Sequence, residues 1–145
     1  MKRFFKLSGA VLASILISLS AFGFTFFGCG KGAGGKVDLD LSAMSGTVVY
    51  AEVYNIVYSP SSYLGKTMRI KGSYAENYYA PTGKTYSYIV IADATACCSQ
   101  GLEVELNGKT SPSYGDEIIV TGVFTSYEEL GKTYYTVSAT DITRA

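Results

Sequence analysis

The sequence predicts a mainly β protein, a small barrel of five short strands preceded by one N-terminal helix. Two observations support this prediction. Several segments after residue 66 alternate apolar and polar residues or are rich in β-branched and aromatic side chains, and glycine-containing turn sequences separate them. The chain has 145 residues, of which about 100 remain after an N-terminal leader and a glycine-rich segment, and this is the size of one domain.

The helix is expected over residues 46–58, before the strands begin. Apolar residues recur there at helical spacing, although the same segment also alternates and contains many β-branched residues, as a strand would. Ser45 is expected to cap the start of this helix, and Pro60 marks its end. The sequence therefore favours one short helix immediately before the barrel.

The strands follow this helix. They are expected at residues 67–76, 86–93, 102–106, 117–125 and 134–142. Alternation is clearest in the third of them, where Leu102, Val104 and Leu106 are separated by glutamates. That strand should bury one face and expose the other to water. Five short strands separated by turns are typical of a small barrel.

The N-terminus has the order of a bacterial lipoprotein export signal. Basic residues precede a long apolar run, and the small residue Gly28 stands directly before Cys29. We expect cleavage before Cys29 and lipidation of that cysteine; the alternative is an uncleaved signal anchor, since about 18 apolar residues can span a bilayer. Either places the domain on the extracytoplasmic face of the cell membrane. The expected boundaries are a signal at 1–28, a flexible tether at 29–40 and a barrel domain at 41–145.

The composition argues against several classes of function. Three of the 12 Lys and Arg residues lie in the leader, which leaves nine against 12 Asp and Glu residues. This acidic balance does not fit a nucleic-acid partner, which would require a basic surface. The chain has no histidine, the commonest general base and metal ligand. No nucleophile has a visible base, so we expect a protein that is not an enzyme.

The triplet Gly-Lys-Thr occurs at residues 65–67, 83–85, 108–110 and 131–133. A phosphate-binding loop needs another glycine five positions before the Gly-Lys pair, and none of the four triplets has one. We therefore expect tight turns, in which glycine adopts a positive φ and threonine opens the next strand.

Cys97 and Cys98 are the most unusual chemical feature of the predicted domain, and four interpretations stay open. A bond between them would be strained, because adjacent Cα atoms lie only about 3.8 Å apart. With Asp93 they could hold a soft metal ion such as Cu(I), if a turn capped by Asp93 places both sulfurs on one side. One thiol could form a mixed disulfide that its neighbour resolves. Both could also be small packing residues.

Tyrosine is the dominant aromatic residue, with 13 copies and no tryptophan. Tyr78, Tyr79, Tyr86 and Tyr88 fall on one predicted hairpin. Together they could form a stacking surface for sugars or for a protein partner. The alternative is ordinary pairing of tyrosines across neighbouring strands.

The order of several motifs resembles a known group of proteins. The motifs are Pro60, Tyr63 to Lys66, Met68 to Gly72, Ala92-Asp93, Cys97-Cys98 and Glu117 to Gly122. They resemble small bacterial lipoproteins of unknown function with an OB-like, tRNA-anticodon-like barrel and, more distantly, the extracytoplasmic domain of permease-subunit membrane proteins. The resemblance implies an OB-like barrel with a Cys-Cys pair after its second strand. The chain departs by having only residues 107–116 where OB folds usually place a helix.

These observations together predict a membrane-anchored binding or accessory module without enzymatic activity, which serves a membrane-protein partner such as a permease. The alternative prediction is a thiol-disulfide or metal-handling protein that uses Cys97 and Cys98. Nucleic acid is not an expected partner of either.

Overall fold

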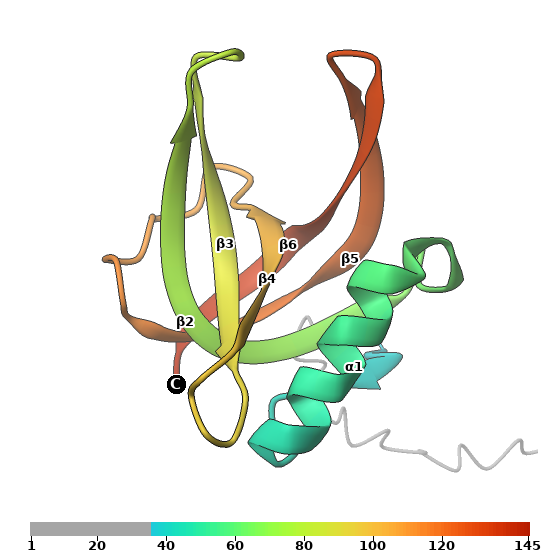
Figure 1. Cartoon of the computed structure of the whole chain (residues 1–145), viewed down its shortest axis with the longest axis vertical. Helices are drawn as coiled ribbons and strands as arrows, with labels where there is room; N and C mark the ends of the chain where they lie inside the picture. Colours follow the sequence, from blue (N-terminus) through green and yellow to red (C-terminus); the bar gives the residue numbers. More distant parts are fainter. Residues whose placement is uncertain (1–35) are drawn as a thin grey trace, which may run out of the picture. The chain divides into compact units, whose positions relative to one another are not determined.

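The computed structural model describes residues 36–145. They form β1 (Leu39–Asp40), α1 (Gly46–Tyr58), the 3-10 turn η1 (Pro60–Ser62), β2 (Thr67–Tyr79), β3 (Lys84–Ala92), β4 (Ser99–Glu105), β5 (Glu117–Glu129) and β6 (Lys132–Arg144) (Figure 1). The predicted helix and all five predicted strands are present, so the mainly β prediction is confirmed. The predicted signal and the lipidation site Cys29 lie outside the described residues.

Strands β2 to β6 close into one barrel. Their order is β2-β3-β4-β6-β5, and β5 pairs back with β2. Neighbouring strands are antiparallel except β4 and β6, which run parallel. When β2 is counted as the first barrel strand, the third and fifth strands are parallel neighbours and the first pairs with the fourth. This is the connectivity of an OB-like barrel, as predicted.

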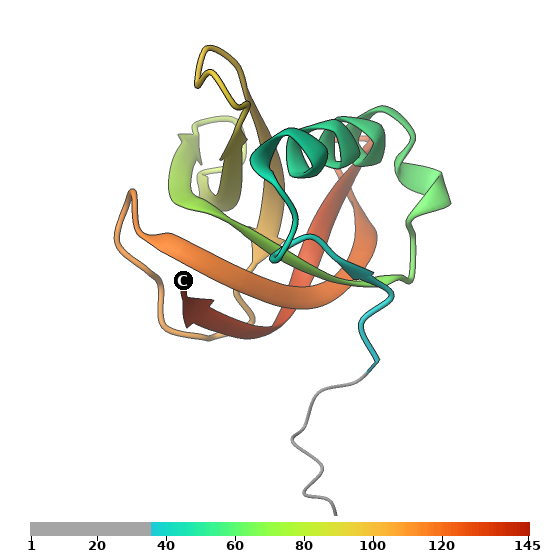
Figure 2. The same ribbon diagram turned by 90° about the horizontal axis from the view of Figure 1, so that it is seen from below.

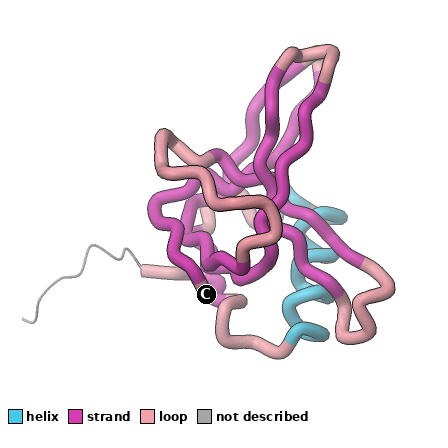
Figure 3. The backbone as a smooth tube through the Cα atoms, turned by 90° about the vertical axis from the view of Figure 1, so that its left-hand side faces the viewer, coloured by secondary structure: helices cyan, strands magenta, loops and turns pink. Residues whose placement is uncertain are grey.

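The core lies inside the barrel and extends beneath α1. Alternate residues of the strands point inward, and among them Ile70, Ile89 and Phe124 are almost completely buried. Helix α1 lies along one side of the barrel (Figures 2 and 3) and buries Val53 and Ile56 against it. Residues 46–58 therefore form a helix rather than a strand, because the apolar face of the helix completes the core.

The start of α1 differs from the expectation in one detail. Ser45 occupies the N-cap position, as predicted, but its side chain makes no capping hydrogen bond. The backbone carbonyl of Ser45 instead accepts the helical hydrogen bond from the Val49 amide. Burial of the apolar face of the helix, rather than a side-chain cap, therefore holds this end in place.

The two hairpins β2–β3 and β5–β6 are longer than predicted. Pairing continues to Tyr79 and Lys84 in the first and to Glu129 and Lys132 in the second. These ends are polar, so they carry no hydrophobic signal. The glycines of all four Gly-Lys-Thr triplets have positive φ, as expected. In the third triplet, however, Thr110 lies in the loop before β5 and opens no strand.

The tether boundary is corrected by the structure. Leu39 and Asp40, placed in the flexible tether by the sequence, form β1 and pair in parallel with Met68 and Arg69 of β2. The expectation of no helix between the third and fourth barrel strands is confirmed, because the residues between β4 and β5 form a loop. Within residues 36–145, no helix is long and apolar enough to cross a membrane.

Candidate functional site: a tyrosine pocket and a dithiol loop

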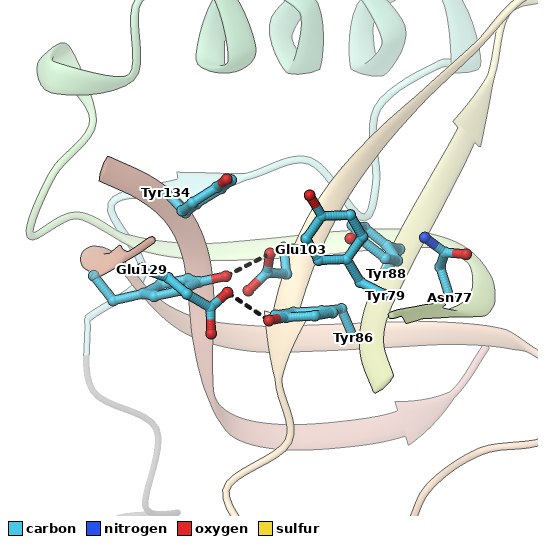
Figure 4. A pocket seen from close by; sticks show the side chains of 8 residues that line it. Asn77, Tyr79, Tyr86, Tyr88, Glu103, Glu129 and Tyr134 are labelled. Carbon is cyan, nitrogen blue, oxygen red and sulfur yellow. Dashed lines mark hydrogen bonds between the residues drawn. The ribbon is translucent and has the colours of Figure 1, made fainter. Parts of the chain in front are cut away.

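A pocket of about 200 Å³ lies between the β2–β3 hairpin and the β5–β6 hairpin (Figure 4). We call it the tyrosine pocket. Five tyrosines, two glutamates and one asparagine line it: Tyr79, Tyr86, Tyr88, Tyr127, Tyr134, Glu103, Glu129 and Asn77. Their rings and carboxylates come from all five barrel strands, so the pocket depends on the closed barrel.

Strand alternation explains why these side chains meet. Ile89 and Leu102 are cross-strand neighbours that point into the core. Tyr88 and Glu103 are the preceding and following residues of the same two strands, so they pair on the opposite face. The tyrosine pocket is therefore built on the outer face of the barrel wall. The pattern that fills the core with aliphatic residues leaves that outer face free for polar and aromatic ones.

Hydrogen bonds hold the two hairpins together across the pocket. Lys84 Nζ donates to Glu129 Oε1 at 2.7 Å, and the Tyr86 hydroxyl donates to the other oxygen of the same carboxylate. The Tyr127 hydroxyl donates to Glu103 Oε2 at 3.0 Å. The ring of Tyr127 also stacks on that of Tyr134, with centroids 5.6 Å apart. Each carboxylate thus accepts a hydrogen bond from a tyrosine of a strand that is not its neighbour in the sheet.

The two carboxylates differ in their electrostatic surroundings. The hydrogen bond from Lys84, followed by that from Tyr86, lowers the pKa of Glu129. Burial raises the pKa of Glu103; the charges of Glu129 and Glu105 add to this rise, and the Tyr127 hydroxyl opposes it. Among residues 36–145 the salt bridges do not include Glu103.

Glu103 consequently carries a charge that works against folding. A carboxyl group whose pKa is raised in the folded state favours the folded protein while it is protonated, and this contribution is lost as the pH rises through that pKa. When it is ionised, the half-buried Glu103 has no cation beside it among residues 36–145. Charged side chains retained at a cost to stability are characteristic of functional sites.

A second, larger groove of about 770 Å³ continues from the tyrosine pocket and shares Tyr86, Glu103, Tyr127 and Glu129 with it. Thr136, which lies opposite Glu103 on the neighbouring strand, also lines this groove. Its hydroxyl is buried and has no hydrogen-bond partner within residues 36–145. An unpartnered buried hydroxyl can still serve a ligand or an ordered water.

The loop between β3 and β4 forms a second candidate site, at the other end of β3 from the tyrosine pocket (Figure 1). Asp93 Oδ1 accepts hydrogen bonds from the backbone amides of Thr95 and Cys97, each at 3.1 Å. The Asp93 amide donates to the carbonyl of Cys98, which closes the loop. The predicted turn with Asp93 as its cap is therefore confirmed.

This turn brings both sulfurs to the same side. The Sγ atoms of Cys97 and Cys98 are 3.6 Å apart and unbonded, and Cys97 Sγ lies 3.2 Å from Asp93 Oδ2. A tetrahedral metal with bonds of about 2.3 Å separates two thiolate ligands by about 3.8 Å. The three side chains, with ligand atoms within 4.8 Å of one another, thus match a partial metal site.

Two of the other interpretations of the cysteines fit less well. Both thiols are exposed, so the interpretation as packing residues is wrong. A hydrogen bond with Cys97, together with desolvation and the nearby Asp93 charge, raises the pKa of Cys98. A redox thiol that attacks disulfides needs the opposite, a lowered pKa that makes the thiolate available.

The predicted tyrosine surface is partly assembled. Tyr79, Tyr86 and Tyr88 line the tyrosine pocket, but Tyr78 does not. Tyr78 is 63% exposed and directly precedes Tyr79 on β2. Adjacent residues of a strand point to opposite faces, which separates Tyr78 from Tyr79.

Sequence reasoning missed the remaining members of the pocket. The sequence patterns did not indicate Tyr127, Tyr134, Asn77 or Glu129 as site residues, and only 14% of the Glu129 side chain is exposed. Glu103 was expected only on the water-exposed face of its strand. The alternation of Tyr127 and Glu129 was a signal that they share a face, but it did not show which hairpin they would meet.

Fold and site together define an OB-like barrel with a ligand-sized pocket on its outer wall and a vicinal dithiol after its second barrel strand. No family model matches the chain, and no curated protein matches it either. Among solved structures, the chain is similar to the dimeric N-terminal domain of PriB from Thermoanaerobacter tencongensis. The two share 16% identity over 55% of this chain and 94% of that one, with a TM-score of 0.35.

Proposed function

We propose that this protein is a binding module without enzymatic activity, held at the extracytoplasmic face of the cell membrane by a lipid on Cys29, and that its ligand occupies the tyrosine pocket. The observation that carries the proposal is the half-buried Glu103 carboxylate, which lies among five tyrosine rings and has no cation beside it in the described part of the chain. Aromatic faces with a few fixed polar groups are typical of small-ligand sites. The residues that line the pocket include no serine, threonine, cysteine or lysine nucleophile.

Filling the tyrosine pocket should abolish ligand binding. The side chain of Asn77 lines the pocket from β2 and is exposed, so Asn77→Trp should occupy the space while leaving the core intact. We expect compounds from a panel of amines, sugars, amino acids and nucleosides to raise the melting temperature of the unmodified chain but not of this variant. Asn77→Ala, which keeps the pocket open, is the control. Stabilisation that persists in Asn77→Trp would place the ligand elsewhere, and a panel without any hit would count against the proposal.

The membrane location is a separate part of the proposal and rests on the sequence. We expect Cys29→Ser to lack the mass of two acyl chains and to keep its N-terminal signal, as measured by intact mass spectrometry of the membrane fraction, because Cys29 is the residue that receives these chains. An unmodified chain that likewise keeps its signal and carries no acyl chain would favour the uncleaved anchor. The proposed partner is a permease-like membrane protein; its recovery in mild detergent with the unmodified chain, but not with Asn77→Trp, would link it to the tyrosine pocket.

A second candidate function is the handling of a thiophilic metal ion at Cys97, Cys98 and Asp93. The specific observation in its favour is the convergence of three ligand atoms on one side of a loop that Asp93 itself holds in shape. Two thiolates and one carboxylate leave a coordination position open, as expected for a site that passes a metal on rather than storing it. This site is independent of the tyrosine pocket, since the two share no residue.

A further inference from the structure

We propose that the tyrosine pocket binds the ammonium group of an organic cation, with Glu103 as its counter-ion. This inference rests on the proposed binding function and specifies the class of ligand. It follows from three features of the pocket: its uncompensated charge, its aromatic walls, and its size relative to the groove beside it.

The charges around the pocket leave one carboxylate unmatched. Lys84 Nζ contacts Glu129 at 2.7 Å, and 65% of the Lys84 side chain is exposed, so this cation stays at the rim and neutralises only Glu129. Glu103 has the Tyr127 hydroxyl as a partner but no salt bridge among the described residues. The pocket therefore carries a net negative charge, which a cation would balance and a neutral ligand would leave in place.

The aromatic walls favour the same kind of ligand. An ammonium group over a tyrosine face is attracted by the ring quadrupole, and cages of several aromatic rings are a known means of binding such groups. In Figure 4 the rings of Tyr79, Tyr86, Tyr88 and Tyr134 surround the space beside Glu103 and Glu129. The hydroxyls of Tyr86 and Tyr127 donate to these carboxylates, which holds both rings in place at the pocket.

The size of the site indicates a small head group with room for a longer chain. The tyrosine pocket, at about 200 Å³, is smaller than the pockets that enclose drug-sized ligands. It opens into the groove of about 770 Å³ that Thr136 and Glu105 line. The unpartnered hydroxyl of Thr136 can bond a polar chain there. A ligand with its ammonium group in the pocket and its substituent in the groove would occupy both.

The test is isothermal titration calorimetry with the full chain in mild detergent. The probes are choline, cadaverine, a lysine tripeptide with blocked ends, and the neutral isostere in which carbon replaces the nitrogen of choline. We expect a cation to bind about tenfold more tightly than the neutral isostere, which corresponds to about 1.4 kcal/mol. The tightest probe identifies the source: choline or cadaverine for a free small molecule, and the tripeptide for a lysine of a protein partner.

Glu103→Gln should remove most of this preference for the cation, whereas Glu128→Gln should change the affinity less than about twofold. Glu128 is the matched control because it neighbours Glu129 in sequence but does not line the pocket. Glu103→Gln should melt no lower than the unmodified chain, since it removes an uncompensated half-buried charge. Tyr79→Leu gives a second test through a ring at the exposed rim, with an expected loss of about threefold.

The outcomes separate the inference from the proposed function. Equal affinities for choline and its neutral isostere, unchanged by Glu103→Gln, would overturn the cation assignment. If Asn77→Trp abolished the binding of both compounds, the pocket would still be a binding site. Tight binding of a sugar, without binding of any cation, would also overturn the cation assignment and leave the pocket as a binding site. If no probe of any class binds and Asn77→Trp changes nothing, both the inference and the proposed function fail.

Discussion

Gly122→Ala is expected to lower the free energy of unfolding by about 3 kcal/mol. Gly122 lies at the β-bulge of β5, where the register with β6 shifts between Thr121 and Gly122. A Cβ atom there would lie 2.4 Å from the carbonyl oxygen of Ser138 and 2.8 Å from a methyl group of Val137. The closest atom belongs to the backbone of the paired strand, so it cannot rotate away. The strands would have to separate, with loss of packing at the centre of the barrel.

The matched control for this prediction is Gly101→Ala, which adds the same methyl group to another strand. Its nearest neighbour would be a ring carbon of Tyr88 at 4.0 Å, an ordinary contact, so we expect a change below about 0.5 kcal/mol. Urea unfolding followed by tyrosine near-ultraviolet circular dichroism measures both variants. Equal decreases in the free energy of unfolding of the two variants would show that strand glycines affect stability through backbone flexibility rather than through close approach of the strands.

Gly122→Ala should also change the geometry of the tyrosine pocket. The bulge at Gly122 lies in β5 before Tyr127 and Glu129, and bulges bend the strand that carries them. The path of β5 beyond Gly122 brings these two residues to the β2–β3 hairpin, where Glu129 meets Lys84 and Tyr86. A glycine in the barrel wall thus contributes to the geometry of a site formed by side chains several residues further along the strand.

Cys97→Ser is expected to lower the affinity of the dithiol loop for zinc by about a hundredfold or more, which corresponds to about 2.7 kcal/mol. The unmodified chain should bind one zinc ion in competition with a chromophoric chelator. Cys97→Ser lowers the affinity because it removes one of only two thiolates, the ligands that form the strongest bonds of this set. Binding must also release protons, because a metal ligand must be a thiolate and the raised pKa of Cys98 disfavours that form.

Two further variants define the metal ligands. Asp93→Asn retains the Oδ1 acceptor that organises the loop but removes the charge, so an affinity loss of about tenfold would identify Asp93 as a ligand rather than a cap alone. Ser99→Ala, directly after the dithiol, is the control and should not change the affinity. Titration with Cu(I) distinguishes the two ions. Binding of Cu(I) without binding of zinc would indicate that only the two sulfurs act as ligands. Failure to bind either ion would exclude metal handling at this loop.

Much of the fold could be predicted from the sequence because the signals are local. Alternation around Val104 placed a strand with one buried face, and glycines marked the turns. The segment around Val53 carried both helical and strand patterns, and only the barrel face that its apolar side covers decided between them. The turn at the cysteines was predictable in the same local way, since two adjacent side chains can share a side only if the chain leaves the extended conformation.

The tyrosine pocket could not be predicted in this way. Its defining contacts join residues far apart in the chain: Lys84 and Glu129 are separated by 45 positions, and Glu103 and Tyr127 by 24. Each strand pattern indicates which side chains share a face of that strand, but not which other strand will face them. That choice depends on the order of the strands around the closed barrel and on the bending of the hairpins beyond it.

The sequence by itself therefore determined the five strands, their turns and the loop that brings Cys97 and Cys98 together, because each depends on the conformational preferences of neighbouring residues. Only the tertiary structure decided that Glu103 would be half-buried without a cation among five tyrosines. Burial and electrostatic environment are properties of the whole arrangement: a glutamate on the polar face of a strand is solvated or enclosed according to what the rest of the chain places over it.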